Sequence, residues 1–436
     1  MKNKVLMLFL FWLVSSAVFG QNLKQATHAM VVSARKEASE IGVAVMKKGG
    51  NAFDAMVATE LALAVAYPYA GNIGGGGFMV FRKASGEVGS LDYREKAPLA
   101  ATKDMYCNKD GTIIPNVSTE GALAVGVPGT IAGIFAVHDK FGKLPISELF
   151  QPAIDLALKG VEVTTKQAAQ FQKYEADIAR ISGSESLLAK APQQGAIQVY
   201  KALAATLTQI SKQGSNAFYK GEIAKKMIAF LKQKGGILTL KDLELYQVKW
   251  RAPVEFSYKD LKIIAMAPPS SGGITLQQIL KMVEPFPLAS YGHNSEQYIQ
   301  VLTEAERRAF ADRNFFLGDP DFVKMPLKAM VNDLYLKERM QSFSFDKATL
   351  SASLPHGTIA ISESNETTHY SIIDPEGNAV SVTTTLNGAF GSKLYSDELG
   401  FFFNNEMDDF SSKPGTPNSY GLLGSAANSI APQNGC

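Results

Sequence analysis

The segment from residue 52 to residue 66 constrains the fold more than any other part of the chain. It reads AFDAMVATELALAVA, so the helix that it predicts is apolar on every side and has to be buried. Gly49, Gly50 and Asn51 separate it from an amphipathic helix over 36–48, where apolar residues recur at helical spacing and the last turn is basic. We therefore expect two consecutive helices, of which the second lies inside the protein.

A glycine-rich stretch, GNIGGGGFMVF, follows Pro68 and leads into a predicted strand. Four consecutive glycines at 74–77 cost backbone entropy, so we expect another backbone or a ligand to lie close to them. A phosphate-binding loop is the alternative. The stretch lacks both the GK[ST] ending and the following helix of such a loop, which argues against phosphate binding.

The middle of the chain, from about 127 to 340, is dominated by helical patterns with regular start and stop residues. Two stretches rich in Gly and Pro, GVPGTIAG from Gly126 and APPSSGGIT from Ala267, are interpreted as connections between elements. No internal repeat, heptad run or low-complexity linker is found. The pattern predicts one compact α-rich unit with strands at both ends of the chain.

The first twenty residues have the three-part layout of a secretory signal peptide. Lys2 and Lys4 precede an apolar run over 5–14, and small residues follow up to Gly20. A membrane anchor is the alternative, but the run is short for a bilayer core of about 30 Å. Removal at Gly20 takes away two lysines and no acid, so the formal charge falls from +2 to 0. We expect a periplasmic or secreted protein with no membrane anchor and no nucleic-acid partner.

The chain offers little material for disulfides or metal sites. Its only cysteines are Cys107 and Cys436, which cannot supply a disulfide framework for a protein of this size. The five histidines are scattered, and no Cys or His spacing resembles a zinc site. We therefore expect no metal and no other cofactor.

The stretch ESNETTHYSIID, residues 363–374, opens a hairpin. HYSIID and AVSVTTTL alternate in side-chain character on either side of the turn PEGN. We expect Ser, Thr and Tyr on one face of this hairpin and Ile372, Val380 and Val382 on the other. Thr367 and Thr368 are then the first residues of a strand.

Thr367 can act as a nucleophile only if its hydroxyl is activated. The base can be the residue's own α-amino group, whose pKa is ordinarily about 7.7–8.0. That arrangement requires the bond between Glu366 and Thr367 to be cut after folding, by an N-to-O acyl shift followed by hydrolysis of the ester. On this dipeptide alone, an ordinary threonine at the start of a hairpin is the better interpretation.

Two late stretches, NETTHYS and NNEMDDF, are the most specific of a series that begins at about Met30. The series resembles, in the same order, the gamma-glutamyltransferase (gamma-glutamyltranspeptidase) family of N-terminal-nucleophile hydrolases. The resemblance implies an α+β fold, the four-layer αββα sandwich, in one intertwined domain. It also implies a large-subunit region over 21–366 and a small-subunit region from residue 367 to 436. The other stretches that carry it are KKGGNAFDAMVATELALAV, GNIGGGGFMV, LDYREKAP, GALAVGVPGTIAG and APPSSGGIT.

The resemblance also implies roles for individual residues. Thr367 is expected to be both the autocleavage residue, after Glu366, and the catalytic nucleophile, with Thr385 hydrogen-bonded to it. Arg94 is expected to bind the α-carboxylate of the substrate, which a guanidinium fork fits with two parallel bonds. The α-ammonium is expected to be received by Asn387, Glu406 and Asp409. A loop residue, Tyr420, is expected to close the pocket. Without the family, Arg94 and the acids are better interpreted as structural ion pairs and the loop as a surface turn.

The implied reaction is an acyl transfer in two steps. Thr367 attacks the γ-amide of glutathione or a related γ-glutamyl compound, and a γ-glutamyl ester remains after the amine leaves. Water then yields glutamate, whereas an amino acid or dipeptide acceptor yields a new γ-glutamyl compound. The large and small subunits are expected to come from one precursor.

The C-terminal end departs from the family's pattern. After GLLGSAANSIAPQNGC the family continues with a serine pair that contacts the substrate carboxylate and a glycine pair that forms the oxyanion hole. Loss of one oxyanion donor alone costs about 10²–10³ in rate. We therefore expect an incomplete sandwich and a poor or inactive enzyme, or a fragment of an intact one. Two alternatives stay open: an inactive remnant, and a cephalosporin-acylase-type amidase, against which Arg94, Glu406 and Asp409 argue.

Overall fold

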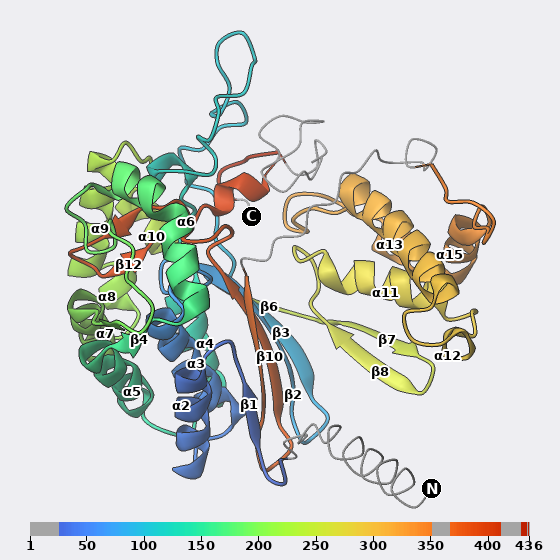
Figure 1. Ribbon diagram of the computed structural model, residues 1–436, viewed down its shortest axis with the longest axis horizontal. Helices are drawn as coiled ribbons and strands as arrows, with labels where there is room; N and C mark the ends of the chain where they lie inside the picture. Colours follow the sequence, from blue (N-terminus) through green and yellow to red (C-terminus); the bar gives the residue numbers. More distant parts are fainter. Residues whose placement is uncertain (1–25, 351–366, 411–428, 434, 436) are drawn as a thin grey trace, which may run out of the picture.

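The structure is a computed structural model that describes residues 26–350, 367–410, 429–433 and 435. The proposed signal peptide, Glu366 and Tyr420 lie outside these residues. Figure 1 shows a larger part built from a sheet with helices on one side of it, and a second group of helices across the molecule. The mixture of helices and antiparallel strands confirms the predicted α+β class.

A six-stranded sheet joins early and late parts of the chain. The late hairpin β9–β10 is inserted between two early strands, with Met30 opposite Ile373 on one side and Gly76 opposite Thr385 on the other. All the pairings in this sheet are antiparallel. In spatial order its strands are β1 (Met30–Val32), β9 (Thr368–Ile373), β10 (Ala379–Thr385), β2 (Gly76–Arg82), β3 (Val88–Asp92) and β6 (Lys249–Arg251).

Helix α3 (Ala52–Ala66) is the buried helix that the sequence predicts. All of its residues are buried, and it packs against α2 (Lys36–Lys47), α5 and the hairpin β9–β10. Asn51 caps its N-terminus in a reciprocal pair with Asp54. Of the helices that follow in the larger part, α4 and α5 pack against α3. These helices are α4 (Thr130–Phe141), α5 (Ile146–Lys159), α6 (Thr165–Ser182), α7 (Lys201–Gln213), α8 (Asn216–Tyr219), α9 (Glu222–Gln233) and α10 (Leu240–Leu245).

The second group of helices has its own small apolar clusters, one of them around Met282, Val301 and Leu336. It lies on the other side of the sheet in Figure 1, in yellow and orange. It consists of a hairpin, β7 (Val254–Tyr258) with β8 (Leu261–Ala265), and the helices α11 (Gly272–Val283), α12 (Leu288–Tyr291), α13 (Glu296–Phe316), α14 (Leu327–Met330) and α15 (Asp333–Met340).

Strands are not confined to the ends of the chain, so that expectation was wrong. The middle of the chain contributes β6 to the main sheet and the hairpin β7–β8 to the second group. Short two-residue strands also pair away from the main sheet, where runs of alternation are too brief to be recognised in a sequence. These strands are β4 (Val161–Glu162), β5 (Ile197–Gln198), β11 (Tyr395–Ser396) and β12 (Phe401–Phe402).

The two faces of the hairpin β9–β10 differ from the prediction in their polar residues. Ile372, Val380 and Val382 are buried as expected, but Thr368, Tyr370 and Thr384 are buried on the same face. Residues 370 and 372 are two apart in a strand and therefore point to the same face. The Tyr370 hydroxyl donates a hydrogen bond of 2.6 Å to Glu60 of α3, which allows this polar group to be buried.

The glycine run at 74–77 lies against other backbone, as predicted. A Cβ on Gly75 would lie 2.1 Å from the carbonyl oxygen of Thr385, and one on Gly77 would lie 2.3 Å from that of Thr383. Because glycine has no Cβ, the backbone of β10 can approach this run more closely than it could approach any other residue. Within the described ranges, no helix combines the length and the apolar character needed to cross a membrane.

Candidate active site

Thr367 lies one residue before β9 begins, and its side chain is exposed. Its hydroxyl oxygen lies 3.2 Å from that of Thr385, the last residue of β10, which is 3% exposed. Thr385 in turn accepts a hydrogen bond of 2.8 Å from the backbone N–H of Asn387. A hydroxyl has one donor and two acceptor positions, so either threonine can donate in this contact while Thr385 also accepts from Asn387.

Asn387 connects the end of β10 to a later segment. Its φ of 72° lies in the left-handed region, which asparagine adopts more readily than most residues, and the strand ends there. Its side-chain amide donates to the backbone carbonyl of Asn405 at 3.0 Å. Asn405 precedes the 3₁₀-helix η3 (Glu406–Asp409), so this bond ties the threonine pair to the acidic residues.

Arg94, just after β3, lies between two of those acidic residues. Its guanidinium forms ion pairs with Glu406 and, at 2.8 Å, with Asp409. The side chain of Glu406 is 1% exposed, whereas that of Asp409 is 31% exposed. The guanidinium also lies 5.4 Å from the ring centroid of Phe78, which is within the range of a cation–π contact. The structure therefore brings together the arginine and both acids that the resemblance implicates.

Glu95 is a member of this cluster that the sequence analysis missed. It is fully buried, and neither of its carboxylate oxygens has a hydrogen-bond partner among the described residues. Burial raises the pKa of Glu95 to about 7, against the opposing effect of the Arg94 charge. Burial likewise raises the pKa of Glu406 well above its ordinary value, although Arg94 opposes the shift. The cluster therefore contains three carboxyl groups, those of Glu95, Glu406 and Asp409, beside the single guanidinium of Arg94.

Asn404 is a second residue that the sequence analysis missed. Its side chain bonds the N–H and the carbonyl of Gly126 and the carbonyl of Gly74, each at 2.9 Å. Its side-chain oxygen also accepts from the N–H of Glu406 at 3.1 Å. The stretch from Gly126 is therefore more than a connection, because it helps to fix η3 beside the glycine run. Side-chain bonds to distant backbone leave no pattern in a sequence.

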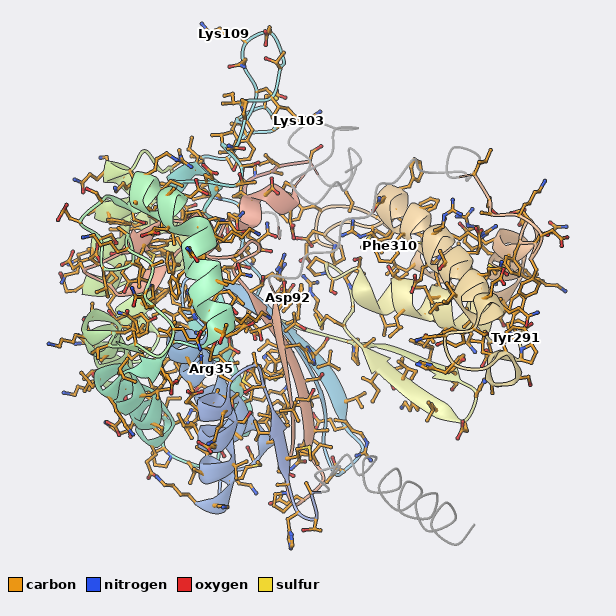
Figure 2. All side chains as sticks on the ribbon, viewed as in Figure 1. Arg35, Asp92, Lys103, Lys109, Tyr291 and Phe310 are labelled. Carbon is orange, nitrogen blue, oxygen red and sulfur yellow. The ribbon has the colours of Figure 1, made fainter. Side chains whose placement is uncertain are left out.

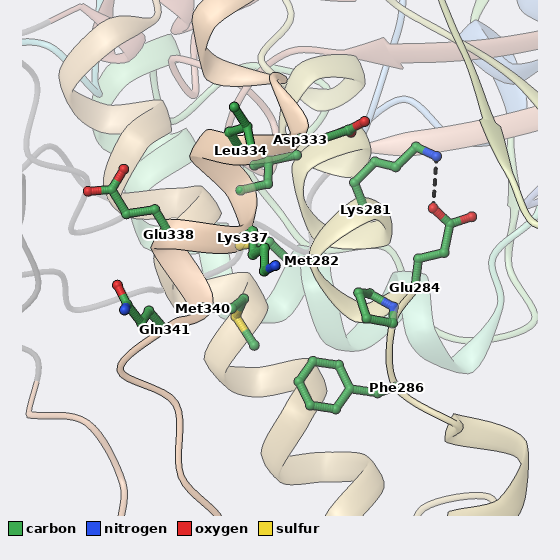
Figure 3. A pocket seen from close by; sticks show the side chains of 12 residues that line it. Lys281, Met282, Glu284, Phe286, Asp333, Leu334, Lys337, Glu338, Met340 and Gln341 are labelled. Carbon is green, nitrogen blue, oxygen red and sulfur yellow. Dashed lines mark hydrogen bonds and ion pairs between the residues drawn. The ribbon is translucent and has the colours of Figure 1, made fainter.

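A groove in the second group of helices lies away from these residues. It runs between α11 and α15 and is lined by residues 281–286 and 333–341 (Figure 3). Two of its charged residues, Lys281 and Glu284, form an ion pair at 2.8 Å. Nor does any group of His, Cys, Asp or Glu side chains in the described residues have an arrangement suited to a metal ion. The nucleophile and the charged cluster are thus the better candidate for chemistry.

Comparison with known proteins gives a consistent result. The chain matches the family model described as Gamma-glutamyltranspeptidase over residues 38–434. A glutathione hydrolase proenzyme from Pseudomonas sp. (strain A14) is 46% identical over 415 residues, which cover 93% of this chain and 71% of that protein. The crystal structure of Helicobacter pylori gamma-glutamyltranspeptidase is 42% identical, with a TM-score of 0.74, and the match covers 77% of this chain and 97% of that one. The crystal structure of a cephalosporin acylase from Bacillus halodurans is 23% identical and has a TM-score of 0.79. The match covers 96% of this chain and 76% of the acylase chain, so the two share the fold.

Proposed function

The chain belongs to the gamma-glutamyltranspeptidase family, and we propose that Thr367 is the residue through which it transfers γ-glutamyl groups. The family consists of enzymes with the N-terminal-nucleophile hydrolase fold, and the activity of this chain is γ-glutamyl transfer or hydrolysis, with glutathione as a donor. One observation supports the choice of residues. A continuous series of contacts runs from Thr367 through Thr385, Asn387 and Asn405 to the pair of Glu406 with Arg94.

The proposed chemistry uses the hydroxyl and the amine of one residue. Thr367 Oγ1 attacks the γ-carbonyl carbon of the donor while its proton passes to the α-amino group of Thr367. That group then protonates the leaving amine, and the γ-glutamyl ester remains. Water gives glutamate and restores the hydroxyl, or an amino acid or dipeptide amine gives a new γ-glutamyl compound. Thr385 supports the attack by donating its hydroxyl proton to the Thr367 oxygen.

The free amine requires a covalent event before any turnover. In the proposal, Thr367 attacks the carbonyl of Glu366, the acyl group shifts from nitrogen to oxygen, and water hydrolyses the ester. The products are a large-subunit region over 21–366 and a small-subunit region that begins at Thr367. Two relatives that are glutathione hydrolase proenzymes support this proposal, since a proenzyme is a precursor that is processed.

Arg94 and the acids form the proposed γ-glutamyl binding site. The α-carboxylate of the donor takes a position on the Arg94 guanidinium, and its α-ammonium is received by Glu406, Asp409 and Asn387. In the structure the two acids are paired with Arg94, so the donor exchanges partners with them instead of meeting unpaired charges. A head group with both charges favours a γ-glutamyl donor over the acyl group of a cephalosporin-type substrate.

The proposal extends to the cellular setting and the pocket entrance. Residues 1–20 direct the chain to the periplasm or out of the cell as a cleaved signal peptide. Tyr420 closes the pocket over a bound donor. The partners are glutathione and other γ-glutamyl compounds, water, and amino acid or dipeptide acceptors.

The test starts from the purified full-length chain. We expect a gel to show two polypeptides, mass spectrometry to place Thr367 at the start of the smaller one, and γ-glutamyl-p-nitroanilide to release p-nitroaniline. Thr367→Ala should leave one polypeptide and no release. Thr112→Ala, which removes an exposed loop hydroxyl, is the matched control and should behave as the parent chain. Release by an uncut chain would contradict the mechanism, and an uncut, inert parent chain would favour the remnant hypothesis.

A further inference from the structure

The main chain of Arg94 is held from both sides. Its backbone N–H donates to Asp92 Oδ1 at 3.1 Å, and its carbonyl accepts from the Tyr246 hydroxyl at 2.8 Å. Tyr246 is itself fixed by stacking on Tyr219, with 5.7 Å between ring centroids and 6° between ring planes. The direction of the Arg94 side chain therefore depends on where Asp92 and Tyr246 hold its peptide groups.

Asp92 in turn is held by an arginine that the proposed mechanism does not use. Arg251 Nε donates to Asp92 Oδ2 at 2.8 Å, so the two oxygens of one carboxylate serve Arg251 and the Arg94 peptide. The side chains of Arg251 and Asp92 are 14% and 10% exposed, which shields the pair from solvent. Asp92 lies near the middle of Figure 2, between the two groups of elements.

The other end of Arg251 reaches the second group of helices. One terminal nitrogen donates to Asp321 Oδ2 at 2.8 Å and lies 4.0 Å from Asp319. Both acids belong to the loop after α13, where Asp319 also accepts from the Asp321 N–H at 2.9 Å. Arg251 thus connects Asp92, the last residue of β3, to a loop of the second group. Its planar fork suits two carboxylates in fixed directions.

Such a network need not add much stability. A shielded ion pair loses solvation that its attraction only roughly restores, so its net contribution to folding is small even though its geometry is narrow. What the network does fix is the rotation of the Asp92 carboxylate. Without Arg251, Asp92 can rotate, and the Arg94 peptide loses one of its two constraints.

We propose that Arg251 is a positioning residue of the γ-glutamyl site, which orients Arg94 through Asp92 and anchors it to the loop at 319–321. The inference rests on the proposed binding of the α-carboxylate by Arg94. Arg251 contacts no substrate atom in this scheme. Its effect should therefore be confined to ligands that carry the group that Arg94 binds.

The test measures binding, by calorimetry, of L-glutamate and of 4-aminobutyrate, which is glutamate without its α-carboxylate. A displacement of about 1 Å can cost on the order of 100-fold in rate when it misaligns a bound group. We expect Arg251→Gln to weaken the binding of L-glutamate at least about tenfold. Binding of 4-aminobutyrate should stay within about twofold. The matched control is Arg180→Gln, whose exposed guanidinium pairs with Glu120 and Asp177 away from this network and should change neither ligand.

Two further variants keep the test decisive. If Arg251 acts through Asp92, Asp92→Asn and Arg251→Gln together should weaken L-glutamate no more than either change alone. Should circular dichroism show that Arg251→Gln does not fold, Asp321→Asn replaces it, with a smaller but equally selective loss expected. Equal losses for both ligands, additive losses, or none would overturn the inference. A parent chain that binds no L-glutamate would instead contradict the proposed function on which the inference rests.

Discussion

The two ends of the candidate site are built in opposite ways. At one end, Arg94 is paired with two acids, and its backbone is bonded on both sides. At the other end, Thr367 is exposed, and the contact described for its hydroxyl is one with Thr385. The fold thus prepares the recognition end before any ligand arrives. In the proposed mechanism the reacting end, by contrast, acquires its base only through a covalent change.

This difference predicts that a substitution of Arg94 lowers the free energy of unfolding, whereas a substitution of Thr367 abolishes activity with little effect on stability. Arg94→Met removes the cation from a cluster in which Glu95 and Glu406 are buried. Since stranding a buried charge costs about 3–5 kcal/mol, we expect the free energy of unfolding at pH 8 to fall by about that amount. At pH 5 the loss should be smaller, because the buried acids can take up protons.

Urea denaturation checks this prediction, with both proteins in the uncut Thr367→Ala background so that cleavage does not differ. The Thr367→Ala change itself should alter the unfolding free energy by no more than about 0.5 kcal/mol, as expected of an exposed side chain away from special features. A comparable loss of stability from both changes would remove the contrast between the two ends.

The second prediction concerns the threonine pair. Thr385→Val keeps the shape of the side chain but removes the hydroxyl 3.2 Å from that of Thr367. We expect cleavage and turnover to slow by about 100-fold, the lower range for a positioned proton-transfer group. Thr385→Ser, which keeps the hydroxyl, should recover most of the rate. Time courses of cleavage on a gel measure the effect, and equal rates for the Val and Ser variants would sharpen the case against a role for this hydroxyl.

Local patterns were enough to predict the elements that depend on local sequence. The uniform apolarity of 52–66 predicted a buried helix, and the glycines at 74–77 predicted close backbone, both of which the structure confirms. The prediction placed Tyr370 on the polar face of the hairpin because its side chain carries a hydroxyl, and this was wrong. Tyr370 is two residues from Ile372 in the strand and so shares its buried face. Its partner, Glu60, lies 310 residues away in the sequence, so the compensation could not be foreseen.

The site residues likewise divide into those that sequence motifs identified and those whose role depends on tertiary contacts. Arg94, Glu406 and Asp409 were singled out by resemblance, and the structure brings them into contact, although their roles stay predictions. Glu95 and Arg251 were missed, since their importance depends on burial and on partners in distant segments. A charged residue beside a motif gives no sign of whether it faces solvent or the interior. Contacts of this kind need the fold.

The third prediction uses the pKa of Glu95 at the recognition end. In the native state that pKa is raised from 4.5 to about 7 by burial, so between these values the native protein keeps a proton that the unfolded chain has lost. The resulting stability is fully present below about pH 4.5 and declines as pH rises toward 7.

Glu95→Gln cannot ionise and should remove this decline. We expect the unfolding free energy of the variant, relative to the parent, to rise by about 3 kcal/mol between pH 4.5 and 8, as linkage gives for a shift of this size. Glu244→Gln, at an exposed position of α10, is the control and should follow the parent. Parallel pH profiles for the parent and Glu95→Gln would show that the native pKa of Glu95 is not raised above 4.5 and would contradict the prediction.

The smallest effect is expected from an ion pair of similar chemistry outside the site. Glu376 lies in the turn between β9 and β10, and its carboxylate is 2.5 Å from the Nζ of Lys143. The side chains of Lys143 and Glu376 are 47% and 59% exposed. Solvent screening limits such pairs to about 0.2–1 kcal/mol, so Lys143→Gln should lower the unfolding free energy by at most that amount. Turnover of γ-glutamyl-p-nitroanilide should not change, because the turn lies at the opposite end of the hairpin from Thr367. A tenfold loss of turnover would mean that the far end of the hairpin controls the nucleophile, and the two ends of the site could then no longer be treated as separately built.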